Sequence, residues 1–117
     1  MTKRELSQLY YLDKDIERER RLLAELEQSG APDDIIEGTR EVIRCKLRES
    51  EIVRMRTIHW IMQLDDAFLR QIFMMRHIDR LTWAAVAVRI GGDNTADGVR
   101  MAHDRYIARH NDAEPNE

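Results

Sequence analysis

The sequence predicts an all-α protein: a long N-terminal helical hairpin with coiled-coil-like spacing, followed by a unit of three shorter helices. Apolar residues recur at intervals of three and four positions through most of the 117 residues, which is the period of an amphipathic helix. Residues typical of helix ends, Gly30 with Pro32 and Gly91 with Gly92, divide this pattern. Aromatic residues make up only 6% of the chain, so we expect a modest core of Leu, Ile, Val and Met.

The first helix is expected to begin at Thr2. Glu5 follows three residues later and completes a capping box, in which each side chain accepts a backbone N–H of the other residue. A 3-4 spacing of apolar residues then continues to the first break, interrupted at Glu19; it comprises Leu9, Leu12, Ile16, Leu23 and Leu26. This run has fewer heptads than a long zipper needs, so we expect the helix to pack on its own neighbour in the chain.

The second helix is expected to run from about Asp33 to Leu64, unless Gly38 delays its start. Its first half has a narrow apolar stripe of Ile36, Ile43 and Leu47. From Ile52 onward the apolar residues lie all round the helix: Val53, Met55, Ile58, Trp60, Ile61, Met62 and Leu64. A helix that is apolar on several sides is buried on several sides. We therefore expect this half to contact the first helix, the C-terminal unit and a second copy of the chain.

The C-terminal unit is expected to begin with a helix after Asp65 and Asp66, either of which suits its N-terminus. Its apolar face is formed by Phe68, Leu69, Ile72, Phe73 and Met75. The chain is thus divided into a helical hairpin for dimerisation (1–64), a C-terminal three-helix module (65–110) and a tail expected to be disordered (111–117).

Two further helices are predicted within the C-terminal unit. Thr82 suits the N-cap of the first, and its apolar stripe comprises Trp83, Val86, Ala87 and Ile90. Gly91 and Gly92 suit a left-handed turn, and Asn94 or Thr95 suits the N-cap of the second. Two short helices joined by such a turn are the parts of a helix-turn-helix.

The same residues form a longer pattern: an apolar–Arg–aromatic group, a turn, a capped helix with an apolar–Ala pair, a Gly turn, and then Thr and Val-Arg. In this chain the pattern reads Met75-Arg76-His77-Ile78-Asp79, Leu81-Thr82-Trp83, Val86-Ala87, Ile90-Gly91, Thr95 and Val99-Arg100. It resembles the region-4 module of sigma-70-type factors. Together with the opening residues 2–6 and 9–12, and with residues 91–92 and 94–97, it is similar to a family of small prophage regulators that carry this module at their C-terminus.

The resemblance implies sequence-specific binding of double-stranded DNA in the control of phage or prophage genes, with RNA polymerase as a second candidate partner. Three residues depart from the family pattern. His77 stands where an aromatic residue is usual, Arg80 where the turn usually has Gly, and Gly98 where Ser is usual. We expect Arg80 to strain its turn, and Gly98 to weaken the last helix by about 1 kcal/mol relative to Ala.

The charge distribution places the positive charge on the same module. The whole chain carries a formal charge of −3, whereas residues 67–110 contain 7 Arg and 4 Asp, a net charge of +3. Nucleic acid requires positive charge at its contact surface. The excess is mild, so we expect a homodimer or a polymerase partner to supply further affinity.

The face of the last helix that would meet DNA follows from a rotation of 100° per residue. With Val99 inward, the residues Ala102, His103 and Tyr106 are also inward, and the outward face is centred on Asp97, Met101, Asp104 and Ala108. A carboxylate at Asp97 can accept a hydrogen bond from the amino group of cytosine. The candidate DNA-binding residues are Arg89, Asn94, Thr95, Ala96, Asp97, Gly98, Arg100, Met101, Asp104, Arg105 and Arg109.

The sequence does not point to an enzyme, a cofactor or a metal site. The four histidines do not have metal-ligand spacing with Cys45 or with one another, and Cys45 is expected to be a small packing residue. A single Cys fits a reducing compartment. The longest unbroken apolar run, residues 83–88, is far shorter than the roughly 20 residues of a membrane span, so we expect a cytoplasmic protein without membrane contact.

Two other functions remain open. Small terminase subunits of DNA-packaging machines also join a helix-turn-helix to an oligomerising helical region, although they usually place the DNA module first. The second alternative is a helical adaptor protein whose helix-turn-helix does not bind DNA. The acidic residues on the last helix favour that alternative, because they repel phosphate.

Overall fold

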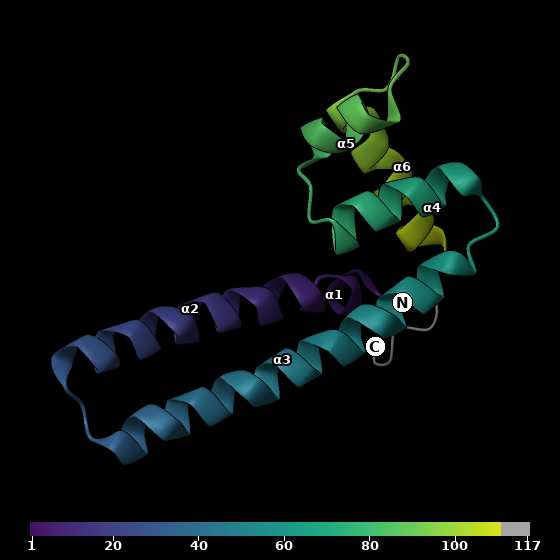
Figure 1. Ribbon diagram of the computed structural model, residues 1–117. Helices are drawn as coiled ribbons and strands as arrows, with labels where there is room; N and C mark the ends of the chain where they lie inside the picture. Colours follow the sequence, from purple (N-terminus) through teal and green to yellow (C-terminus); the bar gives the residue numbers. More distant parts are fainter. Residues whose placement is uncertain (111–117) are drawn as a thin grey trace.

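The computed structural model describes residues 1–110, and within them the predicted all-helical fold is confirmed (Figure 1). The elements in chain order are α1 (Lys3–Leu6), α2 (Gln8–Ser29), α3 (Asp33–Met62), α4 (Ala67–Phe73), the π-helical turn η1 (Met74–Ile78), α5 (Trp83–Ile90) and α6 (Ala96–Arg109). The tail 111–117, predicted to be disordered, lies outside the described residues. None of these helices is long and apolar enough to cross a membrane.

Helices α2 and α3 form an antiparallel hairpin, as expected of a helix that packs on its own neighbour (Figure 1). Gly30 ends α2 in the left-handed conformation, with φ 73°, which glycine adopts without steric cost. Glu19, which interrupts the apolar spacing of α2, forms an ion pair across the hairpin, with its carboxylate 3.3 Å from Nζ of Lys46. The buried residues of the hairpin are Leu9, Leu12, Ile16, Ile43 and, near its C-terminal end, Thr57 and Ile61.

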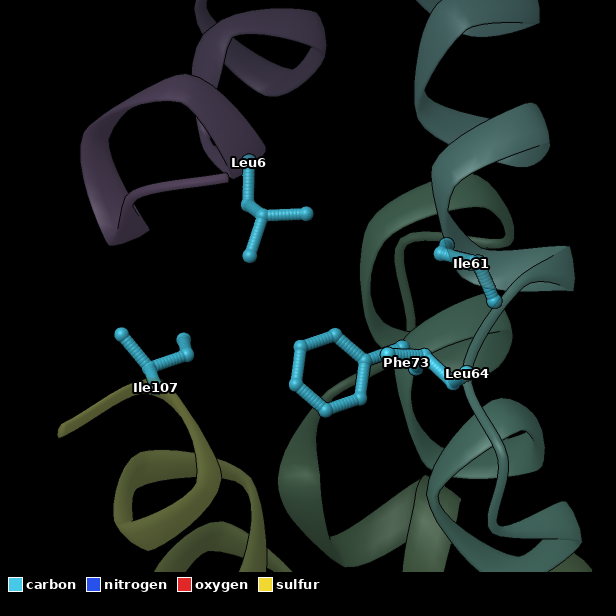
Figure 2. Packing of buried hydrophobic residues seen from close by; sticks show 5 residues of the cluster. All are labelled: Leu6, Ile61, Leu64, Phe73 and Ile107. Atoms are coloured by element: carbon cyan, nitrogen blue, oxygen red, sulfur yellow. The ribbon is translucent and has the colours of Figure 1, made fainter. Parts of the chain in front are cut away.

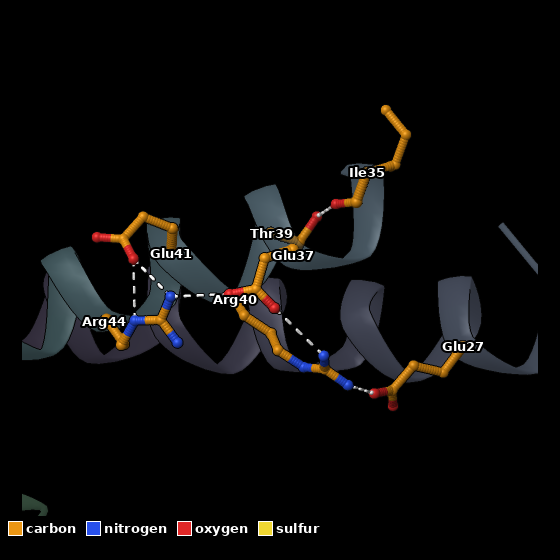
Figure 3. Close-up of polar contacts among 7 residues, drawn as sticks. All are labelled: Glu27, Ile35, Glu37, Thr39, Arg40, Glu41 and Arg44. Carbon is orange, nitrogen blue, oxygen red and sulfur yellow. Dashed lines mark hydrogen bonds and ion pairs between the residues drawn. The ribbon is translucent and has the colours of Figure 1, made fainter. Parts of the chain in front are cut away.

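Close to the Gly30 turn, α3 carries a row of surface ion pairs, one of which reaches across the hairpin to α2 (Figure 3). The Arg40 guanidinium of α3 donates to Glu27 of α2 at 2.7 Å and to Glu37 at 3.4 Å, and Arg44 donates to Glu37 and Glu41. These side chains are about half exposed, so water and salt screen the pairs and each contributes little stability.

The N-terminus is fixed as the capping box predicts. Glu5 Oε1 accepts the Thr2 backbone N–H at 2.8 Å, and Thr2 Oγ1 accepts the Glu5 N–H at 3.0 Å. The helix is interrupted at Ser7, however, so that α1 is a separate four-residue helix. This short helix places Leu6, only 1% exposed, in the main core.

The main core is the junction between the hairpin and the C-terminal unit. It consists of Leu6, Ile61, Leu64, Phe73 and Ile107, contributed by α1, α3, the segment after it, α4 and α6 (Figure 2). The predicted role of the C-terminal half of α3 as the junction is therefore confirmed for Ile61 and Leu64.

Other predictions about α3 are wrong. Gly38 does not delay the helix, which begins at Asp33 and passes through it. Met55 and Met62 are 54% and 66% exposed, so the expected contact of this half with a second copy of the chain stays a prediction. Cys45 is exposed rather than packed. Pairing with α2 and the main core covers only part of the circumference of a helix.

A second, smaller core lies within the C-terminal unit. It consists of Ile72 from α4, Val86 and Ala87 from α5, and Val99 from α6. The predicted apolar stripe of α5 is thus buried against its two neighbours. This core positions α6 relative to α5, whereas Ile107 fixes the other end of α6 to the main core.

Arg80, the residue expected to strain its turn, has φ 60°, a left-handed conformation that L-residues adopt at a cost. Its guanidinium also reaches α2. Nη1 lies 2.9 Å from Oδ2 of Asp13, Nη2 lies 4.0 Å from Glu17, and the group sits 5.2 Å from the ring centroid of Tyr10. A glycine would relieve the backbone but would lose this connection between the turn and the hairpin.

We expect the two effects at Arg80 to be separable by two variants. Arg80→Ala and Arg80→Gly both lose the contacts with α2, but only Arg80→Ala keeps a Cβ in the left-handed conformation. Arg80→Ala should therefore be less stable than Arg80→Gly by about 1 kcal/mol in urea unfolding. Equal stability of the two variants would contradict the presence of backbone strain at this position.

Candidate nucleic-acid interface

Helices α5 and α6 begin at the predicted N-caps. Thr82 Oγ1 accepts the Ala85 N–H at 3.1 Å, and Thr95 Oγ1 accepts the Gly98 N–H at 3.0 Å. Each hydroxyl therefore satisfies a backbone donor that has no partner within its helix. Thr95, a candidate DNA-binding residue, has a structural role as the cap of α6.

The turn between α5 and α6 is built from glycines and one asparagine. Gly91 and Gly92 have φ of 80° and 64°, in the left-handed region that favours glycine. Asn94, another candidate residue, donates from Nδ2 to the carbonyl oxygen of Gly91 at 2.8 Å. Its side chain thus holds the turn that joins the two helices.

The orientation predicted for α6 is confirmed on its inward side. Val99 and His103 are at most 1% exposed, and Ala102 and Tyr106 are half-buried. On the outward side, the exposed candidate residues are Asp97, Met101, Arg105 and Arg109, together with Ala108 between them. The candidate Ala96 is half-buried at the start of the helix.

The placement of Asp104 at the centre of the outward face is wrong. Its side chain is only 33% exposed and lies on the edge of α6 that faces α1. One carboxylate oxygen is 2.9 Å from Nδ1 of His103 and 3.7 Å from Nζ of Lys3, and the other is 3.6 Å from Arg100. A carboxylate with three such partners is held in contacts within the chain rather than extended from the outward side of α6.

The arginines of the candidate interface differ in their surroundings. Arg100 lies 3.6 Å from both Asp97 and Asp104, so its charge is largely compensated within the helix. Arg89, Arg105 and Arg109 are exposed, and no carboxylate of residues 1–110 lies within ion-pair distance of them. These three are the better candidates for phosphate contacts.

Gly98, a departure from the family pattern and a candidate residue, is explained by the cap of α6. A Cβ at this position would lie 3.0 Å from Oγ1 of Thr95, tighter than ordinary contact. Glycine thus leaves room for the hydroxyl that accepts its own N–H. The loss of helix propensity is the cost of a close-fitting cap.

A buried series of hydrogen-bonded side chains, His77–His103–Asp104, lies beside this interface and is not evident from the sequence. Nε2 of His77 in η1 lies 2.8 Å from Nε2 of His103 in α6, and Nδ1 of His103 lies 2.9 Å from Oδ1 of Asp104. Because the carboxylate accepts from the Nδ1–H of neutral His103, the His103 Nε2 accepts in turn from His77. The His103 ring is stacked on Phe73 at 4.5 Å between ring centroids, with Trp83 edge-on at 4.9 Å.

The imidazole rings of His77 and His103 are both held in the neutral form. Burial, with help from His103 and Arg76, lowers the pKa of His77 to about 3. Burial also lowers the pKa of His103, against the opposing effect of Asp104. Burial favours neutral Asp104, but the hydrogen bond from His103 and the charge of Lys3 hold its pKa below its ordinary value.

The sequence predicts part of this hydrogen-bonded series. The helical rotation already places His103 on the inward face, and a buried imidazole needs hydrogen-bond partners. Its partner His77 is 26 residues away and lies on a different helix, so no local pattern connects them. His77, where the family pattern has an aromatic residue, thus keeps a ring and adds a polar partner for His103.

We expect the hydrogen-bonded series His77–His103–Asp104 to make the free energy of unfolding of the protein depend on pH. His77 titrates near 6.5 when unfolded and near 3 when folded, so between these values the unfolded chain binds more protons. The free energy of unfolding should therefore fall as pH is lowered through this window. His77→Gln removes that titration, and its stability should fall less than that of the wild type between about pH 6.5 and pH 5, above the main carboxylate range.

The control is His59→Gln, because His59 is exposed on α3. This variant should keep the wild-type slope when unfolding is measured in urea at several pH values. A His77→Gln slope equal to that of the wild type would contradict a neutral, buried His77.

The structure of residues 1–110 brings no three His, Cys, Asp or Glu side chains together in the way a metal ion requires. A scan against protein-family models, a search of curated proteins and a search of solved structures each return no match. What the chain does is therefore inferred from its own side chains and their geometry.

Proposed function

We propose that this chain is a non-enzymatic, DNA-binding transcription regulator of phage or prophage genes. In this proposal α5 and α6 form a helix-turn-helix of the sigma-70 region-4 type, and α6 enters the major groove of double-stranded DNA. RNA polymerase is a candidate partner, as it is for the sigma module that the sequence resembles. The cytoplasm is the compartment in which such a protein would act.

The observation that carries the proposal is the exposure pattern of α6. One side of the helix is fixed by Val99 in the smaller core and by Ile107 in the main core. The opposite side carries exposed Met101 and Arg105, with Asp97 at its N-terminal end. A rigid helix with one free polar side is what major-groove reading requires.

The charge near this side supports phosphate contact. Arg89 at the end of α5, and Arg105 and Arg109 on α6, have no carboxylate partner among residues 1–110. Each could release a counterion from a DNA phosphate, so binding should weaken steeply as salt is raised.

One observation favours the alternative of an adaptor that does not bind DNA. The Asp97 side chain is 85% exposed, and its oxygen lies 3.6 Å from Arg100, the arginine nearest to the bases in the proposed docking. The pair could be no more than a solvated i, i+3 contact at the start of a helix, where an acidic residue is favourable. Under the DNA-binding proposal Asp97 instead accepts from a cytosine amino group and disfavours other sequences.

A change of Asp97 separates these two functions. After selection of a preferred duplex from phage DNA, Asp97→Ala should weaken binding to that duplex by about 1–3 kcal/mol. Binding to random duplex should become tighter, because a charge that repels phosphate is removed. Titrations of both duplexes at low and moderate salt provide the measurement.

The matched control is Asp93→Ala, which removes the same charge from the exposed turn before α6. It should leave the discrimination between the two duplexes unchanged. Equal tightening of Asp97→Ala on both duplexes would exclude a reading role for Asp97. No binding of the wild type to any selected DNA at low salt would favour the adaptor.

We further propose that the regulator is a homodimer, because the mild positive charge of one copy gives limited affinity for DNA. The support is the apolar surface that remains exposed on α3. Ile35, Val42, Ile52 and Met55 are each 40% to 54% exposed. Ile35 and Val42 are seven residues apart and share one face of α3, and apolar side chains that gather on one exposed face are typical of a contact surface.

A dimer formed by this surface should dissociate when charge is introduced there. Sedimentation of the wild type should show a dimer in the micromolar range, and Val42→Lys combined with Ile52→Lys should show a monomer of unchanged helix content. Val88→Lys is the control, because Val88 is 80% exposed on α5, away from the hairpin. A monomeric wild type, or dissociation by Val88→Lys alone, would contradict this interface.

A further inference from the structure

A cleft separates the N-terminal part of the hairpin from the turn that precedes α5. Its volume is about 400 Å³, and its lining includes Ser7, Tyr10, Tyr11, Arg76, Arg80 and Thr82. A smaller cavity of about 210 Å³ shares Ser7, Arg76 and His77 with it and extends towards Lys3 and Arg100. The volume is within the range of small-molecule sites.

Arg76 is the central cation of this cleft. Its Nη1 donates to the carbonyl oxygen of Leu81 at 3.0 Å, and the guanidinium lies 4.5 Å from the ring centroid of Trp83. These two contacts fix its orientation. Arg76 is half-buried, and no carboxylate of the described chain lies within ion-pair distance of it. An oriented guanidinium without a counter-charge is suited to bind an oxyanion through its remaining N–H groups.

The other polar groups of the cleft can assist such an anion. The Thr82 hydroxyl accepts the Ala85 N–H and keeps its own hydrogen to donate. Arg80 also lines the cleft, but its charge is paired with Asp13 at 2.9 Å, so Arg76 remains the main cation there. Burial, with the charge of Arg76, lowers the pKa of His77, so this ring of the lining is neutral.

The outer wall of the cleft is aromatic. Tyr10 and Tyr11 are 45% and 62% exposed, and their rings meet edge to face at 5.3 Å between centroids. Exposed tyrosines beside arginines are favourable for stacking on a planar ring. The cleft therefore combines an anion subsite at Arg76 with a stacking surface at Tyr11.

We propose that this cleft binds a free nucleoside monophosphate, with the phosphate at Arg76 and Thr82 and the base against Tyr11. A free nucleotide supplies both an anion and an exposed ring. A DNA duplex supplies phosphates on a convex surface but keeps its bases stacked inside, so it does not fill both subsites. The cleft lies beside the hairpin rather than on the outward side of α6, and its ligand does not depend on DNA binding.

The proposal is tested on the full chain by calorimetric titration with the four ribonucleoside monophosphates and with inorganic phosphate. At least one nucleotide should bind, and inorganic phosphate should bind more weakly because it lacks the ring. The same titration with a single-stranded oligonucleotide distinguishes a free nucleotide from one within a strand.

Two variants address the two subsites. Arg76→Lys keeps the charge but loses the planar fork, and should weaken nucleotide binding about tenfold. Tyr11→Ala removes a mostly exposed ring and should weaken it about fivefold or more. Arg54→Ala is the matched control, because Arg54 is exposed on α3 and does not line the cleft. Circular dichroism melting checks that each variant is folded.

Nucleotide binding that is weakened by Tyr11→Ala and unchanged by Arg54→Ala supports the proposal, even if Arg76→Lys fails to fold. Absence of nucleotide binding at millimolar concentration overturns it. Equal affinity for inorganic phosphate, equal weakening by Arg54→Ala, or tighter binding of the oligonucleotide per nucleotide also overturns it. None of these results depends on whether the protein binds duplex DNA.

Discussion

The packing of Phe73 in one core with three other helices and the segment after α3 is the contact on which the rest of the structure depends. Its side chain is fully buried, and its core partners are Leu6, Ile61, Leu64 and Ile107. A four-residue helix such as α1 has no stability of its own, so its position follows from the burial of Leu6 at this point. The same contact joins the two parts of the chain, because the hairpin and the C-terminal unit both contribute to it.

The sequence predicts the features of this fold that are local. The caps at Thr2, Thr82 and Thr95 follow from short motifs, and the inward side of α6 follows from helical rotation. Contacts between distant residues could not be predicted in this way. Arg80 and Asp13 are 67 residues apart, and their ion pair joins a turn to a helix that meets it only in the folded chain. The sequence therefore indicates strain at Arg80 but not the contacts that come with it.

In the candidate interface, too, the sequence predicts the local features but not the contacts between distant residues. Exposure of Asp97, Met101 and Arg105 follows from the helical period. The position of Asp104 does not, because a surface carboxylate turns towards whichever partner the fold brings near. Here the partners are His103 beneath it and Lys3 from the opposite end of the chain. A polar group that is committed to internal partners helps to fix the rotation of α6, and it thereby defines which side of the helix is free.

The distribution of buried residues along the hairpin has a consequence for its motions. The fully buried side chains lie at the end near the main core, whereas Leu23 and Leu26, close to Gly30, are only half-buried. Backbone amides near Gly30 should therefore exchange with solvent through local opening, and those around Ile61 only through global unfolding. The hairpin is thus anchored at the end that joins the main core and opens locally at the end near Gly30. Its outer turns can therefore change conformation while the C-terminal helices keep their arrangement.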